Sequence, residues 1–169
     1  MSKQPSHNLW SQNLHFATYK ADITVTILPD IDNVFVHGPL WIKSKTLAKN
    51  LNIQLKRGQY LAFEIKDMFS DGASVPRPLW PLMHPFDHDL LAPAIAHDYL
   101  YRQKTIKLYV YDRIKGEMRP LGLRHINRKA ADALFYEKMR DFGASYPKAI
   151  TAYAAVRAFG KKAYINGRI

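Results

Sequence analysis

Alternating hydrophobic and polar residues near the N-terminus predict β structure. Residues 23–27 alternate isoleucine or valine with threonine before Pro29 ends the run, which is the period of two that a half-buried strand requires. Further strands are predicted at 34–36, 40–43, 53–55 and 60–65, with the last two joined as a hairpin by Lys56-Arg57-Gly58. The part of the chain up to residue 68 is therefore expected to form a small antiparallel sheet.

The pattern changes near residue 69. Residues 69–86 contain an Asp-Gly pair, four prolines and several bulky aromatic residues, which favour an irregular loop. Helices are then predicted over 89–104, 126–142 and 147–159, the last two followed by Gly143 and Gly160 as C-terminal stops. Between the first two helices, residues 106–111 and 113–119 are expected to pair as a small β wing around Asp112.

These elements predict a single α+β domain over residues 1–169, mainly β over 1–68 and helical over 69–169. A chain of 169 residues is long enough to bury a core. Hydrophobic residues make up 47% and charged residues 23% of it, which is ordinary globular usage and argues against a disordered chain. The pattern shows no internal repeat and no coiled-coil heptads.

Composition limits the possible chemistry and partners. The chain has no cysteine, which excludes disulfides, thiolate metal sites and a cysteine nucleophile. A formal charge of +11 favours anionic partners, but the basic residues are spread along the chain, so a dedicated nucleic-acid groove is not expected. Residues 1–10 lack the apolar core of a signal peptide, and no segment has the length and apolarity of a transmembrane helix.

An ionisable pair, His97-Asp98, interrupts an otherwise apolar and aromatic helical segment. At helical spacing both residues flank the buried side, with Ala94 and Tyr101 on the same stripe. Burying such groups costs free energy unless they have partners. They are therefore candidates for chemistry. The alternative is a core histidine that bonds a backbone group, with Asp98 at the helix edge.

Two more carboxylates are candidate partners. Asp132 shares a helix stripe with Phe135 and Met139 and points toward the core, where it could orient an imidazole. The alternative is a simple i, i−4 ion pair with Arg128. Asp71 precedes Gly72 in a loop. The pair could be only a turn, or it could supply a carboxylate and a free carbonyl to a hard cation such as calcium.

Taken in order, five features resemble the secreted prokaryotic phospholipase A2 family over about the last 100 residues. They are Asp71, Pro85-Phe86-Asp87, the segment 94–102 with His97-Asp98, the segment 127–139 with Asp132, and the segment 152–160. Over most of its length the chain also resembles, more closely, a phage and prophage family of unassigned function, domain of unknown function 1353. Its marks are Asp71-Gly72-Ala73-Ser74-Val75-Pro76 and His97-Asp98-Tyr99-Leu100-Tyr101.

The phospholipase resemblance implies two long antiparallel helices in which His97 is the general base and Asp132 its partner. It also implies a calcium ion held by Asp71, Asp98 and the carbonyl of Gly72. The substrate would be an ester in an anionic phospholipid at a membrane surface. The phage resemblance implies other virion proteins as further partners, and a location in the virion, or in the host cytoplasm before assembly. Alanines at 73 and 94 stand where the secreted family has cysteines.

Two rival functions remain open. The order His84, His88, His97-Asp98, Asp132 imitates metal-dependent phosphohydrolases with an HD site, and the three histidines could form a zinc trio. The other rival is a non-catalytic tail or baseplate component of a virion, docking through its basic surface with Trp10, Trp41, Trp80, Phe86 and Tyr60 as candidate interface residues. The sequence has no nucleophile elbow, P-loop or dinucleotide fingerprint.

Overall fold

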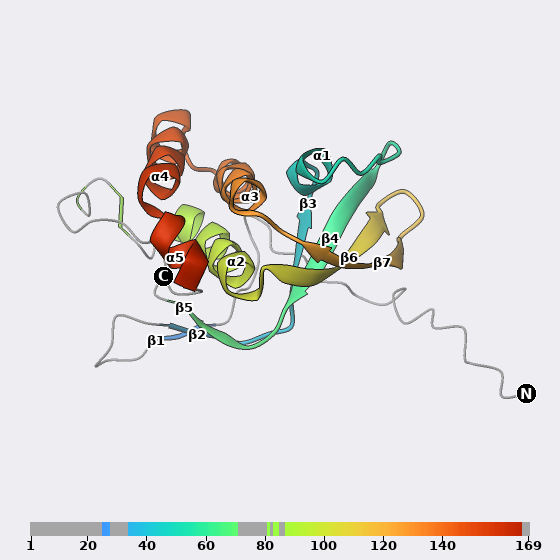
Figure 1. The fold of residues 1–169 in the computed structure, drawn as a ribbon, viewed down its shortest axis with the longest axis horizontal. Coiled ribbons are helices and arrows are strands. Elements are labelled where there is room, and N and C mark those ends of the chain that lie inside the picture. The colour runs from blue at the N-terminus through green and yellow to red at the C-terminus, as the bar shows by residue number, and fades with distance from the viewer. Residues whose placement is uncertain (1–24, 28–33, 71–80, 82, 85–86, 167–169) are drawn as a thin grey trace, which may run out of the picture.

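A four-stranded antiparallel sheet lies beside a group of helices in the computed structural model, which describes residues 25–27, 34–70, 81, 83–84 and 87–166 (Figure 1). The strands are β3 (Leu40–Ser44), β4 (Gln59–Ile65), β6 (Thr105–Asp112) and β7 (Glu117–His125), in the order β3-β4-β6-β7. The combination of helices and antiparallel sheets confirms the predicted α+β class.

The predicted β wing is confirmed as the pair β6–β7, but the two strands are not a separate feature. β6 also pairs with β4, so that Tyr60 lies opposite Tyr111. The sheet therefore joins segments from both halves of the chain. The change from mainly β to mainly helical sequence near residue 69 therefore marks no boundary in the sheet, because β6 and β7 follow the first long helix.

A second, three-stranded sheet contains β1 (Val25–Ile27), β2 (Val34–Val36) and β5 (Met68–Ser70) in the order β1-β2-β5. β2 leads into β3, and β4 leads into β5, within a few residues. Two chain segments thus pass from one sheet into the other. Gly38 lies at one passage, where a Cβ atom would stand 2.7 Å from the Ile65 carbonyl oxygen, so only glycine permits this approach.

The predicted hairpin over 53–65 is wrong. The structure has a short helix, α1 (Thr46–Asn50), followed by irregular chain, and β4 pairs with β3 instead. Ile53 and Leu55 pack partly buried against the core while Gln54 is exposed. Their alternation therefore reflects one-sided packing of an irregular segment. Glu137 fixes the start of α1 by accepting a hydrogen bond from the Lys45 amide at 3.0 Å.

The three predicted helices are confirmed within two residues at each end. They are α2 (His88–Gln103), α3 (Arg128–Asp141) and α4 (Tyr146–Phe159), and a short α5 (Lys161–Asn166) that was not predicted follows them. The Ile126 amide donates to the Lys104 carbonyl at 2.6 Å, so the end of α2 lies beside the start of α3. Leu90, near the start of α2, packs in one buried cluster with Met139, near the end of α3, so the two helices are antiparallel neighbours.

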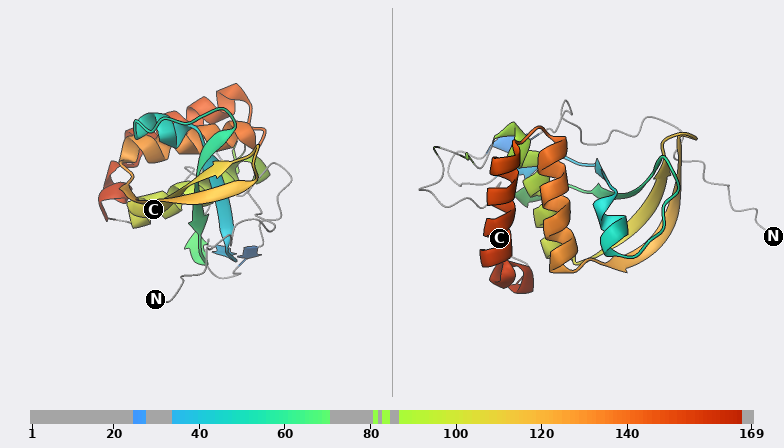
Figure 2. Two further views of the ribbon diagram at one scale, coloured as in Figure 1. Left: turned by 90° about the vertical axis from the view of Figure 1, so that its right-hand side faces the viewer. Right: turned by 90° about the horizontal axis from the view of Figure 1, so that it is seen from above.

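The main core lies between the four-stranded sheet and helices α1, α2 and α3. Figure 2 shows helices α2, α3, α4 and α5 standing together at one end of the molecule, while α1 lies beside the sheet and the β6–β7 hairpin extends away from the helices. A second buried cluster, with Leu90, Phe135 and Met139, fills the space where α2, α3 and α4 meet. Within the described residues, no helix combines the length and apolarity needed to cross a bilayer.

Candidate functional site

The antiparallel packing of α2 and α3 brings His97 and Asp132 together, as predicted. The His97 Nε2 atom lies 2.8 Å from the Asp132 Oδ1 atom. Both residues are buried, with exposed fractions of 5% and 0%. The His97 ring also packs on Tyr101 and Phe135, with ring centroids 4.0 and 4.9 Å away. Aromatic contacts and one hydrogen bond therefore fix the imidazole.

The hydrogen bond to Asp132 assigns a role to each nitrogen of His97. A carboxylate is only an acceptor, so the neutral imidazole carries its proton on Nε2 and donates it to Asp132. The Nδ1 atom is then the acceptor, and it has no hydrogen-bond partner within the described residues. This arrangement is the one that a general base requires.

Asp132 is held by two further donors. The Tyr101 hydroxyl donates to Oδ1 at 2.6 Å, and the Arg157 guanidinium of α4 donates to Oδ2 at 2.7 Å. Burial opposes ionisation of this carboxyl. Hydrogen bonds from His97, Tyr101 and Arg157 outweigh it, so the pKa of Asp132 is lowered. Burial, and then the bond to Asp132, raise the pKa of Tyr101 far above its ordinary value, so the phenol stays a donor.

The predicted ion pair between Asp132 and Arg128 also exists, but it is secondary. The Arg128 guanidinium lies 3.8 Å from the Asp132 Oδ2 atom, compared with 2.7 Å for Arg157. Arg128 instead donates to the carbonyl oxygens of Val156 and Arg157, at 3.3 and 3.0 Å. It therefore ties the end of α4 to α3 beside the buried carboxylate.

Asp98 is almost completely buried, with 1% exposure, so it does not lie at a helix edge. Its Oδ2 atom accepts a hydrogen bond from the Ser70 hydroxyl at 2.6 Å. Ser70 is the last residue of β5 and directly precedes Asp71. Asp71 and Gly72, the other predicted calcium ligands, lie outside the described residues, so the predicted calcium site is described only on its Asp98 side.

Sequence reasoning missed Tyr101, Arg157 and Ser70. Tyr101 lies four residues after His97, so the same helix face could have pointed to it. Ser70 and Arg157 lie 28 and 25 residues from their partners. The packing of β5 and α4 against α2 and α3 places Ser70 and Arg157 beside these partners. No local sequence pattern predicts such contacts.

Gly160, directly after α4, leaves the space that the Tyr101 hydroxyl occupies. A Cβ atom at this position would lie 2.5 Å from the Val156 carbonyl oxygen and 2.6 Å from the Tyr101 hydroxyl. We expect Gly160→Ala to destabilise the protein by about 1–3 kcal/mol, measured by denaturant unfolding. Helix propensity alone would favour alanine. If Gly160→Ala lowers the free energy of unfolding less in a Tyr101→Phe protein than in wild type, the clash with the hydroxyl is its cause. An equal decrease in both proteins would contradict this explanation.

Lys148 on α4 fixes the other end of α2. Its ammonium group bonds both oxygens of the Asp89 carboxylate, at 2.8 and 3.0 Å, and the Asp87 carboxylate at 3.0 Å. Burial opposes the charge of Lys148, but both carboxylates outweigh it, and the pKa of Lys148 is raised. α4 therefore contacts the start of α2 through Lys148 and the buried Asp132 carboxylate through Arg157.

The predicted zinc trio does not form. His84 and His88 are exposed, whereas His97 is buried against α3. No group of three histidine or acidic side chains among the described residues is arranged to hold a metal ion. The upstream histidines lie at and before the solvent-facing start of α2, several helical turns from His97. The chain order of an HD phosphohydrolase is therefore present without its three-histidine metal geometry.

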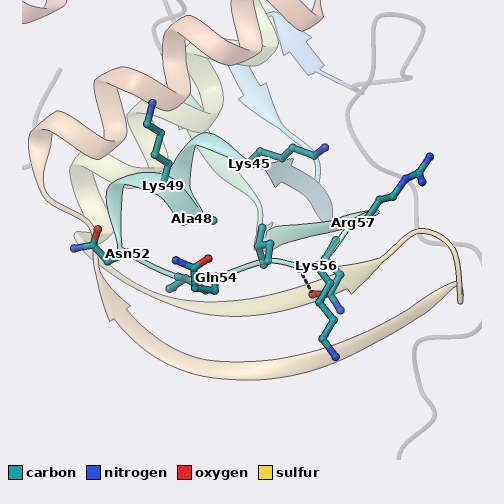
Figure 3. A pocket seen from close by; sticks show the side chains of 10 residues that line it. Lys45, Ala48, Lys49, Asn52, Gln54, Lys56 and Arg57 are labelled. Atoms are coloured by element: carbon teal, nitrogen blue, oxygen red, sulfur yellow. Dashed lines mark hydrogen bonds between the residues drawn. The ribbon is translucent and has the colours of Figure 1, made fainter.

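A groove of about 530 Å³ beside α1 is the other feature of interest (Figure 3). Its lining, entirely within the described residues, includes no carboxylate and four basic side chains, Lys45, Lys49, Lys56 and Arg57. Figure 3 shows their charged ends fanning outward around the rim, while the amide of Gln54 lies within. Such an arrangement suits an extended anionic surface better than one small anion.

Of the candidate interface aromatics, Trp41 and Tyr60 lie in the described part of the chain. Trp41 is buried and packs edge-on against Tyr109, with ring centroids 5.2 Å apart. The Tyr60 ring is covered by the ammonium groups of Lys43 and Lys45, at 5.1 and 4.8 Å from its centroid. Trp10, Trp80 and Phe86 lie outside the described residues.

Residues 46–156 match the model of a family described as a protein of unknown function (DUF1353). The chain belongs to the DUF1353 family. The matched segment of this DUF1353 protein runs from α1 into α4 and contains His97, Asp98 and Asp132, and it ends one residue before Arg157. Comparisons with curated proteins and with solved structures gave no significant match.

Proposed function

We propose that this DUF1353 protein is a phospholipase A2-type esterase that hydrolyses anionic phospholipid with calcium as cofactor. The observation that carries the proposal is the buried His97–Asp132 pair, with Nε2 bonded to the carboxylate and Nδ1 left as a base. Burying these groups is costly in a scaffold that makes no use of them. The resemblance to phospholipase A2 assigns the same roles to the same two residues.

In this proposal His97 is the general base. Its Nδ1 atom takes a proton from a water molecule, and the resulting hydroxide attacks the ester carbonyl carbon. The imidazolium that forms is stabilised by the Asp132 carboxylate at 2.8 Å. The same proton then goes to the leaving alkoxide when the ester bond breaks. No acyl-enzyme is required, which agrees with a cysteine-free chain that has no nucleophile elbow.

The donor chemistry beside His97 fits calcium. Asp98 is a buried carboxylate bonded by the Ser70 hydroxyl, and Asp71 and the Gly72 carbonyl follow Ser70 directly in the chain. All of these are oxygen donors, which calcium prefers. Asp98, Asp71 and the Gly72 carbonyl would hold the ion, which would polarise the ester carbonyl and stabilise the oxyanion.

The test is release of fatty acid from phosphatidylglycerol vesicles with calcium, with magnesium, and after chelation. We expect hydrolysis that saturates with calcium and disappears with chelator. Asp98→Asn should weaken calcium binding, measured by calorimetry. Glu117→Gln, which alters an exposed carboxylate at the start of β7, is the control. Hydrolysis that is indifferent to calcium, or absent from purified protein under all these conditions, would contradict the proposal.

A second candidate function is a non-catalytic virion component, such as a tail or baseplate protein, that docks on an acidic protein surface. The basic groove beside α1 favours it, because four cationic ends surround an opening with no carboxylate in its lining. Charge complementarity of this kind speeds association and selects partners. The phage resemblance supplies the virion context.

Binding of polyglutamate tests the second candidate. Replacing Lys45, Lys49, Lys56 and Arg57 by glutamine should weaken binding at least tenfold at low salt, because rim cations contribute mainly through their field. The matched control removes the same charge from four exposed basic residues elsewhere, Lys107, Lys115, Arg119 and Arg124. Equal loss in both variants would mean that net charge, rather than the groove, binds the polymer.

A further inference from the structure

Two large apolar side chains are exposed where α4 meets α5. Phe159, the last residue of α4, is 80% exposed, and Ile165 on α5 is 60% exposed. Both helices lie on the side of the molecule away from the four-stranded sheet (Figure 1, Figure 2). A single exposed apolar residue is ordinary on a protein surface, but here two of them stand close together in the chain.

The same region is basic. Lys161 and Lys162 lie between the two apolar residues, are exposed, and form no ion pair within the described residues. After Asp141 the sequence contains no aspartate or glutamate, although it still contains five lysines and arginines. Two of these, Lys148 and Arg157, already bond carboxylates of other helices. The free cations and the apolar side chains together form what we name the α4–α5 corner: Phe159, Lys161, Lys162 and Ile165.

Contacts on the inner side of α5 fix which of its residues face outward. The Tyr164 ring packs on Tyr101, with ring centroids 5.2 Å apart, and its hydroxyl donates to the Ile126 carbonyl at 2.9 Å. Lys161 and Ile165, four residues apart, share an exposed face of the same helix. The outward direction of this apolar and basic face is therefore set by the packing of α5.

Two kinds of occupant fit an exposed apolar corner, a second copy of the chain and a membrane. A second copy would bring the same lysines, and a molecule with a formal charge of +11, against the corner, so like charges would oppose the contact. An anionic bilayer attracts lysines through its headgroups and takes up apolar side chains at the boundary with its acyl chains. Charge complementarity therefore favours the membrane.

We propose that the α4–α5 corner is the surface through which this protein docks on anionic lipid membranes, with its two apolar side chains entering the headgroup region and its two lysines binding lipid phosphates. The inference rests on the proposed function for its choice of lipid as partner. Gly160, between the two helices, lies against Tyr101, whose hydroxyl donates to Asp132. A membrane docked at the corner would thus lie beside the helices that hold the buried pair.

The first test is sedimentation of the full chain with vesicles of equal parts phosphatidylglycerol and phosphatidylcholine, in chelator so that no calcium-dependent turnover interferes. The wild type should bind these vesicles and not phosphatidylcholine alone. The double variant Lys161→Gln, Lys162→Gln should bind about twentyfold more weakly at low salt, because each lysine beside an anionic surface contributes about fivefold. The matched control Lys107→Gln, Lys115→Gln removes the same charge from exposed positions on the β6–β7 hairpin and should lose much less.

Insertion of the apolar side chains is tested separately. Phe159→Ser should weaken vesicle binding about tenfold, because a large apolar side chain no longer leaves water. Leu123→Ser, at a position on β7 that is 67% exposed, should not. Since the chain has no cysteine, Phe159→Cys and Leu123→Cys can each carry one environment-sensitive fluorophore. Its emission should shift to the blue on vesicles at position 159 and stay unchanged at position 123.

Four results would overturn the inference. They are no vesicle binding by wild type, an equal loss in the two double-lysine variants, an equal fluorescence response at both labelled positions, and a dimer in solution that Phe159→Ser makes monomeric. The last would assign the corner to a second copy. If the corner binds vesicles but added calcium brings no hydrolysis, the proposed function fails and the docking holds. If the double variant Lys161→Gln, Lys162→Gln binds and hydrolyses lipid as wild type does, the docking fails and the function holds.

Discussion

Replacing His97 by alanine should reduce calcium-dependent hydrolysis of phosphatidylglycerol to the background of the assay, with the fold retained. A positioned general base contributes a factor of about 10²–10⁴, and no other described side chain offers a free imidazole nitrogen beside Asp132. The fold should survive because Asp132 keeps its bonds from Tyr101 and Arg157. Fatty-acid release and circular dichroism of the same preparation measure the two effects.

Two further variants sharpen this prediction. His97→Gln can place an amide N–H near the position of Nε2 for Asp132 but has no basic nitrogen, so it should be folded and as inactive as the alanine variant. His88→Ala removes an exposed histidine from the first position of the same helix and should retain activity. A His97→Gln protein with wild-type turnover would show that the imidazole is not the base, and the groove-docking candidate would then be the one to pursue.

The long helices could be predicted because their ends carry local signals. Asn127 caps α3 by accepting from the Ala130 amide at 2.9 Å, and the Ser145 side chain caps α4 by accepting from the Lys148 amide. Both are residues that favour N-cap positions. α1 and α5 were missed because each is short, at five and six residues, and too few positions repeat to define a helical period.

Strand partners were harder to predict than strands. The alternation in β4 and β6 identifies both segments, yet nothing local says that residue 60 should lie opposite residue 111. Pairing over that separation depends on α2 folding back across the sheet. The failed hairpin at 53–65 has the same origin. The Lys56-Arg57-Gly58 turn is real, with Gly58 at φ 80°, but the chain before it packs without a partner strand.

The candidate site shows the same division between local and long-range information. The stripes of α2 and α3 predicted that His97, Asp98 and Asp132 are buried, and all three are. The contact between Asp132 and His97 was one of two interpretations of the inward-facing carboxylate, beside an ion pair with Arg128, and the phospholipase resemblance implied the same contact. Arg157 could not be predicted as a site residue, because an arginine in the last turn of a helix usually lies in solvent and interacts favourably with the helix dipole. Here its length carries it back to a buried carboxylate.

Asp132→Asn is expected to cost about 3 kcal/mol of unfolding free energy at neutral pH, because it breaks a buried ionic network from the inside. Asparagine has nearly the same shape as aspartate, so packing is preserved and charge is what changes. The hydrogen bonds from His97, Tyr101 and Arg157 all lose their anionic acceptor. Urea unfolding at pH 7 gives the difference from wild type.

The pH dependence of that difference tests its cause. Three donors outweigh burial and lower the folded-state pKa of Asp132 below its ordinary value of 3.8. A lowered folded pKa means that the stabilisation is complete above about pH 5 and is lost as the pH falls through 3.8 and below. Protonated aspartic acid is nearly isosteric with asparagine. The difference in unfolding free energy between wild type and Asp132→Asn should therefore become steadily smaller from pH 6 toward pH 3.

Comparing wild type with Asp132→Asn also removes the contributions of other titrating groups, because these contribute equally to the unfolding free energy of both proteins. Asp87 has a lowered pKa too, because its contacts with Lys148 and the His84 amide outweigh desolvation, but it is present in both proteins and cancels. A gap that stays constant from pH 6 to pH 3 would mean that Asp132 binds its proton equally well when folded and unfolded. The Tyr101 and Arg157 contacts would then give the charged carboxylate no net stabilisation over the unfolded chain, and the buried ionic network would not be the cause of the lost stability.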